Sequence, residues 1–248
     1  MTEYLTELVL TALAVLITLT VHEFCHGYAA YKLGDKTALY AGRLTLNPTK
    51  HIDPLGALCM LFLHVGWAKP VPVNPRNFKN PRKGFAITAL CGPLSNLILA
   101  FLFSGIYLLT YAWVKDITFT EINFQYNLIK NLLDFLWIFF TVNIGIAIFN
   151  LIPVPPLDGS RILNVILPPK TYFRIMKYER QIYFGLLGWL LLGDYVARAV
   201  RSIPLVSSVP ALYSLSSVFS LSELLSKLIS LIGGLFLDLW QLIPFLNF

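Results

Sequence analysis

The sequence predicts an all-α polytopic membrane protein with about four to six transmembrane helices. Of its 248 residues, 56% are hydrophobic and only 13% are charged, whereas soluble domains carry about 25% charged residues. The apolar residues are also gathered in runs, several of them long enough to cross a bilayer. A chain with this composition cannot hide its apolar surface from water, so we expect it to be embedded in a lipid bilayer.

The charge distribution and the cysteine content exclude a nucleic-acid partner and a disulfide framework. The net charge of +6 is spread over the loops between apolar runs, where Lys and Arg determine topology, so no nucleic-acid partner is expected. The aromatic residues fall inside the runs and at their ends, as core and interface anchors do. An odd number of cysteines outside polar loops gives no disulfide framework, and we expect all three to be packing residues: Cys25, Cys59 and Cys91.

Residues 5–31 form the first apolar run and predict the first membrane helix. The run does not resemble a cleaved signal peptide, because it lacks a basic start and has Glu3 and Glu7 where positive charge is expected. A helix rises about 1.5 Å per residue, so the step from Leu5 to His22 covers about 25 Å. His22 therefore lies near the far end of the span.

Three irregular features are predicted between the first two full spans. Residues 38–47 have β-branched and aromatic residues around Gly42, which predicts a small membrane-associated β hairpin or sheet. Residues 55–67 are apolar but number only about thirteen, fewer than the roughly 17 needed to span, so they predict a re-entrant or short tilted element. The four prolines of residues 68–83 exclude a helix and favour extended edge strands or loop, buried in protein or lining a wet cavity.

The second part of the chain alternates apolar runs with basic or polar segments. Residues 84–113 predict a long helix, and residues 132–152 predict another that the following prolines interrupt. The other expected elements are a short polar loop at 115–130, a basic amphipathic stretch at 161–180, an apolar run at 182–197 and a last hydrophobic helix at 225–245.

Basic residues are distributed unevenly over the loops. Four lie in residues 31–51, five in 69–83 and five in 161–180, but only two lie in 114–131. The positive-inside rule therefore places the first three segments in the cytoplasm and the last one outside, provided that residues 55–67 do not cross. The depth of the polar residues follows from this topology: His22, His26 and Asp158 all lie toward the cytoplasmic ends of their segments.

His22 and His26 are four residues apart and therefore project from the same face of the first helix, one turn apart. Two imidazoles at this spacing can share one metal ion, with Glu23 beside them as general base toward a water that the metal polarises. The alternative, packed and hydrogen-bonded histidines, is less favourable, because two His and one Glu within five residues of a membrane helix are difficult to bury. The pattern predicts a metal site.

A catalytic zinc has three protein ligands, so one more is required. Asp158 is the best candidate, because the prolines before it open the helix and Gly159 allows a close approach to a partner. Its alternative role is the N-cap of the following helix. His51 and His64 are expected to be loop or interface residues. Less suitable acidic residues lie at outer helix ends or in surroundings without arranged partners: Glu7, Asp134 and Asp194.

Together these motifs resemble the site-2 proteases, the intramembrane zinc metalloproteases of peptidase family M50. That family pairs HExxH, here residues 22–26, with a downstream N-x-x-P-x-P-x-x-D-G stretch, here residues 150–159. The segments GRLTLNP, HIDPLG, GWAKPVP and GPLSN, at 42–48, 51–56, 66–72 and 92–96, are also similar to the family. Some members carry PDZ or CBS domains, and this chain resembles the short form without them.

The resemblance implies a role for each site residue. His22, His26 and Asp158 would hold one zinc ion, and Glu23 would take a proton from the attacking water and pass it to the leaving amine. The resemblance covers roughly residues 20–165. We therefore expect residues 1–165 to form the catalytic core and residues 166–248 to be C-terminal membrane helices of unassigned role.

Substrate contacts are implied as well. Asn96 and Asn150 would be polar partners of the oxyanion or of the substrate backbone, with an interhelical hydrogen bond as the alternative for each. The strand-like stretches around Gly42 and Pro70 would pair with an unwound substrate, because a helical peptide bond is not accessible to cleavage.

The expected activity is hydrolysis of a peptide bond within or near a transmembrane segment of a membrane protein, as in regulated intramembrane proteolysis. The expected location is a bacterial or archaeal cell membrane, with the active site toward the cytoplasm. Two other function classes remain open. A membrane zinc-binding or transport protein would need paths on both sides, and the HExxH glutamate and the depth of the site disfavour it. An inactive protease-like scaffold is disfavoured by the complete set of His22, Glu23, His26 and Asp158.

Overall fold

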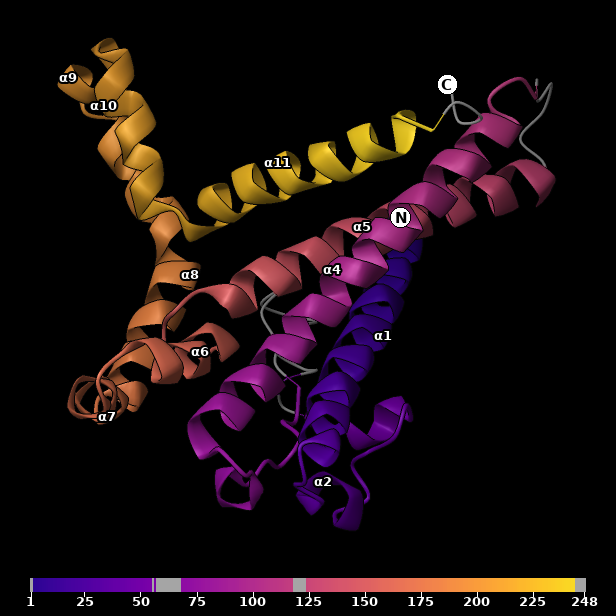
Figure 1. Cartoon of the computed structure of the whole chain (residues 1–248). Helices are drawn as coiled ribbons and strands as arrows, with labels where there is room; N and C mark the ends of the chain where they lie inside the picture. Colours follow the sequence, from indigo (N-terminus) through magenta and orange to yellow (C-terminus); the bar gives the residue numbers. More distant parts are fainter. Residues whose placement is uncertain (1, 55, 57–67, 118–123, 244–248) are drawn as a thin grey trace.

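The computed structural model describes residues 2–54, 56, 68–117 and 124–243, and the regular structure in them is helical (Figure 1). Three long helices dominate: α1 (Thr2–Lys32), α4 (Pro81–Val114) and α5 (Phe124–Leu151). The shorter elements between α1 and α4 are α2 (Thr37–Tyr40), η1 (Pro48–Lys50) and η2 (Pro75–Asn77). The C-terminal part contains α6 (Asp158–Ile166), α7 (Pro169–Met176), α8 (Glu179–Arg201), α9 (Pro204–Ser208), α10 (Pro210–Leu215), η3 (Ser216–Phe219) and α11 (Leu221–Gln241).

The helices α1, α4 and α5 are long and apolar enough to cross a bilayer. They confirm the spans predicted at 5–31, 84–113 and 132–152. A fourth span results if residues 212–219 and α11 are joined across their 103° bend, so the described residues hold three or four of the four to six predicted. Large apolar side chains remain exposed along these helices, as expected for lipid-facing residues, for example Val9, Ile98 and Leu128.

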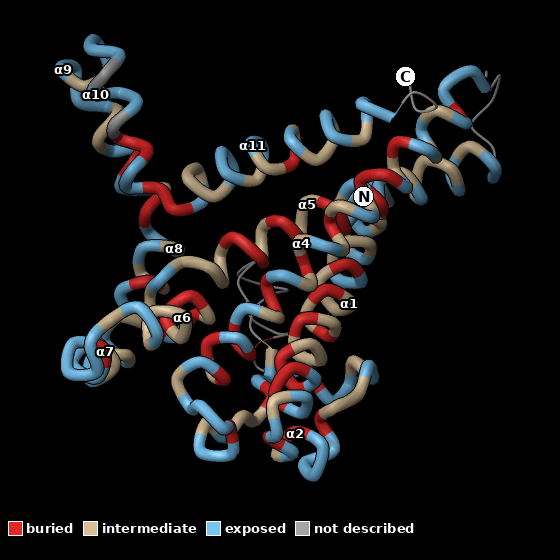
Figure 2. The backbone as a smooth tube through the Cα atoms, in the orientation of Figure 1, coloured by how far each residue is buried: buried red, intermediate tan, exposed pale blue. Residues whose placement is uncertain are grey.

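The central helix of the bundle is α4, which packs along both α1 and α5. Figure 2 shows buried residues concentrated where these three helices face one another, and exposed residues around α7, α9 and α10. Buried residues of α4 and α5 form an apolar cluster that α11 covers with partly buried side chains. At the far end of α11, the indole N–H of Trp240 donates to Phe101 O of α4 at 2.9 Å, so α11 is fastened along its length.

The ends and the interior of α4 follow from its sequence. The Asn80 side chain caps the helix by accepting a hydrogen bond from Lys83 N–H at 3.1 Å, and Pro81 occupies the first turn, where no N–H is needed. Pro93 lies inside the helix and cannot donate to the carbonyl one turn earlier. Gly92, the residue before it, faces His22 and His26 of α1.

The predicted hairpin around Gly42 is wrong. Residues 37–40 form the single turn α2, residues 41–47 have no regular structure, and the described residues contain one isolated antiparallel bridge, between Ile52 and Ala68, but no sheet. Aromatic and β-branched residues favour strands only when a partner strand packs against them, and Tyr40 is 80% exposed. The re-entrant element predicted at 55–67 lies outside the described residues, apart from residue 56.

Asp35 joins the end of α1 to the proline-rich segment at residues 69–77. Its buried carboxylate accepts four hydrogen bonds: from the N–H and hydroxyl of Thr37, from Asn74 N–H at 2.7 Å and from the Asn77 side-chain amide at 2.7 Å. Burial alone would raise the pKa of this carboxyl, but the hydrogen bonds outweigh burial and hold the pKa below its usual value. The segment is therefore fixed relative to α1.

Replacing Asp35 by asparagine is expected to lower the free energy of unfolding by about 1–3 kcal/mol at pH 7, because buried donors lose a charged acceptor. The folded pKa of Asp35 is below the unfolded value. Its stabilising contribution is therefore present above about pH 3.9 and is lost as the pH falls through the folded pKa. Thermal unfolding in detergent tests this: the gap between wild type and variant should narrow below about pH 3.9. A gap that stays constant into acid would contradict it.

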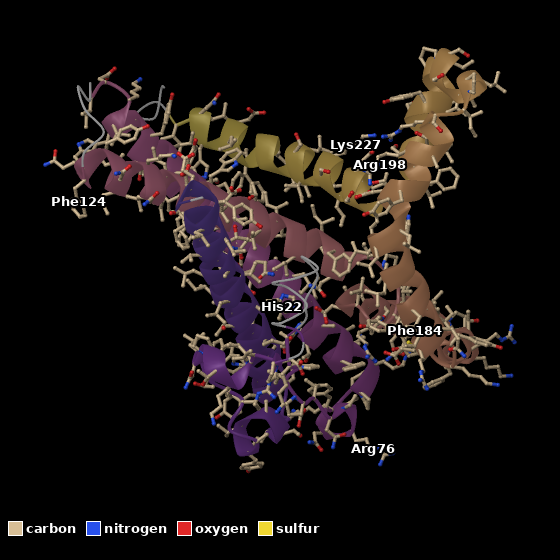
Figure 3. The ribbon with its side chains drawn as sticks, turned by 180° about the vertical axis from the view of Figure 1, so that it is seen from behind. His22, Arg76, Phe124, Phe184, Arg198 and Lys227 are labelled. Atoms are coloured by element: carbon tan, nitrogen blue, oxygen red, sulfur yellow. The ribbon has the colours of Figure 1, made fainter. Side chains whose placement is uncertain are left out.

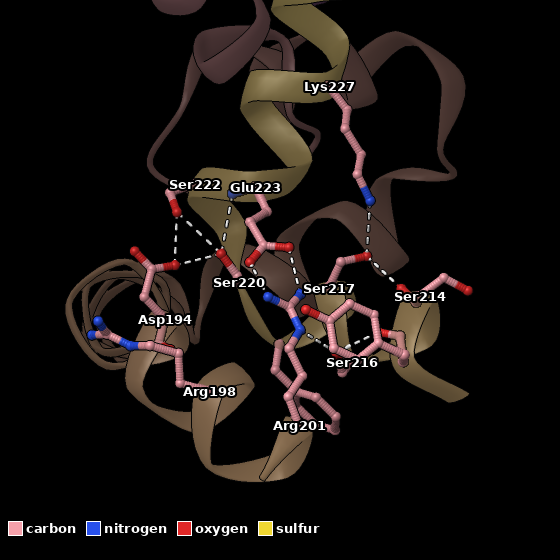
Figure 4. A network of polar contacts seen from close by, with 12 residues as sticks. Asp194, Arg198, Arg201, Ser214, Ser216, Ser217, Ser220, Ser222, Glu223 and Lys227 are labelled. Carbon is pink, nitrogen blue, oxygen red and sulfur yellow. Dashed lines mark hydrogen bonds and ion pairs between the residues drawn. The ribbon is translucent and has the colours of Figure 1, made fainter. Parts of the chain in front are cut away.

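A polar network joins α8 to α11 (Figure 4). The guanidinium of Arg201 donates to both carboxylate oxygens of Glu223, at 2.6 Å each. Asp194 accepts hydrogen bonds from the hydroxyl groups of Ser220 and Ser222. Asp194 had no evident partner in the sequence, and these two serines supply it. The network fixes the start of α11 against the end of α8.

Candidate metal centre

Three side-chain atoms that can bind a metal lie close together: Nε2 of His22, Nε2 of His26 and Oδ2 of Asp158. The two nitrogens are 2.9 Å apart, and the oxygen lies 3.1 Å from each. Both histidines are buried, and Figure 3 shows His22 between the end of the molecule that carries Arg76 and the end that carries Phe124. Zinc bonds to such atoms are about 2.0–2.2 Å long, so one ion can contact all three.

The sequence around Asp158 explains how it reaches α1. Helix α5 ends at Leu151, and the prolines that follow prevent it from continuing. Helix α6 begins with Asp158, and Gly159 packs so closely on the end of α5 that a Cβ would lie 2.3 Å from Leu151 O. The Asp158 side chain is not the N-cap of α6. Its carboxylate faces the two histidines instead.

Gly92 of α4 forms one wall of the centre. A Cβ at this position would lie 2.4 Å from Nε2 of His26 and 2.7 Å from Nε2 of His22. These are the two nitrogen atoms that would bind the metal. The missing side chain of Gly92 therefore leaves the space beside the ligand atoms open.

The other nitrogen of the His26 ring has a partner that determines its protonation. Nδ1 of His26 lies 2.8 Å from the backbone oxygen of Thr88. A carbonyl oxygen can only accept, so the proton resides on Nδ1. In the neutral ring, Nε2 then carries no proton and is available to a metal.

His22 is oriented by Asn96 of α4. Nδ1 of His22 lies 3.1 Å from the Asn96 side-chain amide nitrogen, and the amide oxygen, fully buried, has no hydrogen-bond partner within the described residues. The two ends of an amide have nearly the same shape, and turning it over lets Oδ1 accept the Nδ1 proton. That orientation satisfies the oxygen and leaves Nε2 of His22 free to bind a metal.

Replacing Asn96 by leucine is expected to lower the zinc affinity by about 10–100-fold, the usual effect of losing an outer hydrogen bond to a ligating histidine. Asn96→Asp is the matched control, because its carboxylate still accepts the Nδ1 proton of His22. Competition with a chromogenic chelator measures both affinities. If the two variants bind zinc equally well, Asn96 does not orient His22.

Glu23 adjoins the centre on α1 and is half-buried. Its Oε2 accepts a hydrogen bond from the backbone N–H of Val71 at 2.7 Å. No hydrogen bond to Oε1 is found among the described residues. A carboxylate next to two ligand side chains, with one oxygen held and the other open, is suited to accept a proton.

The other predicted residues do not join the cluster. His51 is buried, and its Nε2 contacts Thr45 O at 2.8 Å, so it is a loop residue as expected. Asn150 donates to Ile146 O of its own helix at 3.0 Å, and its role toward a substrate stays a prediction. His64 lies outside the described residues.

Three features of the site could not be found from the sequence. Two are backbone groups, the Thr88 carbonyl and the Val71 N–H, and any residue type supplies these. The third is the closeness of Gly92 to both histidines, for which the Gly-Pro pair inside an apolar helix was the one available signal. Each contributes by position and not by side-chain chemistry.

The donor set suits zinc. Two imidazole nitrogens and one carboxylate oxygen occur together in catalytic zinc sites, which keep a further position for water or substrate. Within the described residues, no second group of His, Cys, Asp or Glu side chains is arranged to hold a metal. With Glu23 as an adjacent base, the arrangement is suited to hydrolysis.

The sequence of this chain is similar to one protein family and to several named proteins. The sequence profile of Peptidase family M50 matches residues 10–187. A Bacillus subtilis (strain 168) protein named "Putative zinc metalloprotease YwhC" is 39% identical over 186 residues, which are 74% of this chain and 82% of that protein.

Two mycobacterial proteins that share the name "Putative zinc metalloprotease Rip2" are also similar. The protein of Mycolicibacterium smegmatis is 28% identical over 68% of this chain and 61% of its own length. That of Mycobacterium tuberculosis (strain ATCC 35801 / TMC 107 / Erdman) is 28% identical over 71% of this chain and 70% of its own length. No solved structure matches the chain.

Proposed function

Because this chain belongs to peptidase family M50 and is a membrane zinc metalloprotease, we propose that it cleaves a peptide bond within or near a transmembrane segment of another membrane protein. The observation that carries the proposal is the meeting of His22, His26 and Asp158 inside a bundle of three helices long and apolar enough to cross a membrane. The resemblance to the site-2 proteases implies a substrate class, namely a regulatory protein with a single transmembrane segment that is released by regulated intramembrane proteolysis.

The residues divide the reaction between them. His22, His26 and Asp158 would hold the ion, as three protein ligands do in catalytic zinc sites. Zinc, when bound, supplies a Lewis acid that polarises the scissile carbonyl and acidifies the attacking water. Glu23 takes a proton from that water and delivers it to the nitrogen of the broken peptide bond, so that it leaves as an amine.

The proline-rich segment beside Glu23 favours an extended substrate. Pro70 and Pro72 have no N–H, and no hydrogen bond to their carbonyl oxygens is found within the described residues. A substrate backbone that pairs with these two positions can therefore donate to them but receives nothing in return. An unwound substrate with free N–H groups would satisfy these carbonyls next to the proposed base.

The proposed site faces the cytoplasm. Basic residues gather in the loops after α1, in residues 69–83 and in residues 161–180, which is the pattern of cytoplasmic segments. The elements α2 and α7 lie at one end of the molecule, and the end of α4 and the start of α5 lie at the other (Figure 1). Water would then reach the centre without crossing the whole bilayer.

The test is quantitative proteomics of membranes from cells that carry either the wild-type protein or Glu23→Gln at equal levels. A membrane protein that accumulates uncut with the variant, and is cut by purified wild-type protein in proteoliposomes, supports the proposal. Zinc flux across liposomes that the wild type and the variant sustain equally, without cleavage of any membrane protein, would overturn it in favour of transport.

A further inference from the structure

Val71 stands between two residues that cannot donate a backbone hydrogen bond, Pro70 and Pro72. Its N–H is therefore an isolated donor within this stretch of chain. It does not pair with another backbone group, as the N–H of a strand would. It donates to Oε2 of Glu23 on α1, at 2.7 Å.

The segment that carries Val71 is anchored on both sides. Before it, Lys69 N–H donates to His51 O at 2.8 Å, and Arg43 donates to Lys69 O at 2.6 Å. After it, Asn74 N–H donates to Asp35 at 2.7 Å. Asp35 and His51 are both buried, so neither anchor is a flexible surface contact. The position of the Val71 N–H is thus fixed by the protein on either side.

The side chain of Val71 also helps to fix the position of its N–H. Val71 is buried, and one of its methyl groups would lie 3.3 Å from a Cβ at Gly27, one turn after Glu23 on the same helix. Gly27 therefore lets the segment approach α1 closely enough for the hydrogen bond to Glu23 to form. The anchors on either side and the packing against Gly27 therefore hold the Val71 N–H next to the Glu23 carboxylate.

We propose that the Val71 N–H is the positioning group of the catalytic base, which holds Oε2 of Glu23 so that Oε1 faces the water. A long, unbranched side chain such as Glu has several rotamers, and one fixed donor selects among them. A backbone N–H is neutral and far too weak an acid to protonate a carboxylate, so it orients the base without competing for the transferred proton. The proposal rests on the proposed role of Glu23.

Hydrogen exchange tests the contact without measuring cleavage. In residues 69–74 the exchangeable amides are those of Lys69, Val71, Val73 and Asn74, so fragment-resolved mass spectrometry can separate Val71 from the rest. In Glu23→Ala the Val71 amide is expected to exchange at least ten-fold faster than in the wild type, whereas Lys69 and Asn74 keep their rates. In Glu23→Gln, which retains the oxygen acceptor, Val71 should stay protected.

Cleavage kinetics test the consequence. Val71→Pro removes the N–H, and the backbone at this position is already confined to extended conformations because Pro72 follows. Val71→Ala keeps the N–H and removes the packing. We expect kcat of the proline variant to lie at least ten-fold below that of the alanine variant, with similar KM and one zinc bound per chain in both.

The outcomes separate this proposal from the proposed function. If Val71 exchanges equally fast in the wild type and in Glu23→Ala, or if the proline variant matches the alanine variant in kcat, the positioning role is overturned. If Glu23→Gln cleaves substrate at the wild-type rate, Glu23 is not the base and its positioning by Val71 has no catalytic meaning, although cleavage itself stands. Zinc flux without cleavage of any membrane protein would instead overturn the proposed function, whatever the exchange rates show. A proline variant that does not fold leaves the exchange comparison to decide.

Discussion

Replacing Glu23 by glutamine is expected to lower the rate of peptide cleavage by about 10²–10⁴-fold, the usual contribution of a general base. Glutamine keeps the shape of the side chain and an oxygen that accepts from Val71 N–H, but it cannot take up a proton near neutral pH. His22, His26 and Asp158 are unchanged, so the variant should still bind one zinc ion per chain.

The measurement combines initial cleavage rates in proteoliposomes with zinc stoichiometry by elemental analysis. A Glu23→Gln protein that is metal-loaded and still cuts at the wild-type rate would remove Glu23 from the mechanism. Loss of zinc along with activity would mean that Glu23 helps to hold the metal.

Replacing Gly92 by alanine is expected to abolish zinc binding although every ligand remains. The added methyl carbon would lie 2.4 Å from Nε2 of His26 and 2.7 Å from Nε2 of His22, closer than non-bonded atoms can approach. It would displace the imidazoles or the helix that carries them. We therefore expect a loss of affinity larger than the roughly 10–100-fold produced by outer hydrogen-bond changes, and no detectable cleavage.

Gly188→Ala in α8 is the matched control, since a Cβ there meets nothing within 4 Å apart from its chain neighbours and the backbone of its own helix. Both substitutions exchange a helical glycine for alanine, which by itself favours a helix. Zinc content and thermal unfolding of the two variants are compared in the same detergent. Full zinc occupancy in a folded Gly92→Ala protein would show that the centre can rearrange around a methyl group.

The two histidine ligands were easier to predict from the sequence than the aspartate. His22 and His26 are a local pattern, because helical geometry alone puts residues four apart on one face. Asp158 required reasoning about topology, since its contact with His22 spans 136 positions. The loop charges placed both at the same depth, and the structure brings them within hydrogen-bonding distance. Val71 and Thr88 could not be predicted, because they act through backbone atoms.

The long helices could be predicted from the long apolar runs. Shorter elements were harder to predict, because only the local helix or strand propensity of their residues indicated their structure. Helices α1, α4 and α5 follow from spans of apolar residues, and the basic amphipathic stretch at 161–180 forms α6, α7 and the start of α8. The expected hairpin around Gly42 was wrong, because strand propensity has no effect without a partner strand. The polar loop expected at 115–130 is shorter than predicted, since α5 already begins at Phe124.

The order of the ligands along the chain also has a consequence for biosynthesis. His22 and His26 precede Asp158 by 136 and 132 residues, which at a synthesis rate of 5–20 residues per second corresponds to on the order of ten seconds. Throughout that interval the nascent chain carries two imidazoles and a base but lacks the third ligand. The complete set of metal ligands is therefore present only after the three long helices have been made, so a half-inserted chain lacks a finished metal centre.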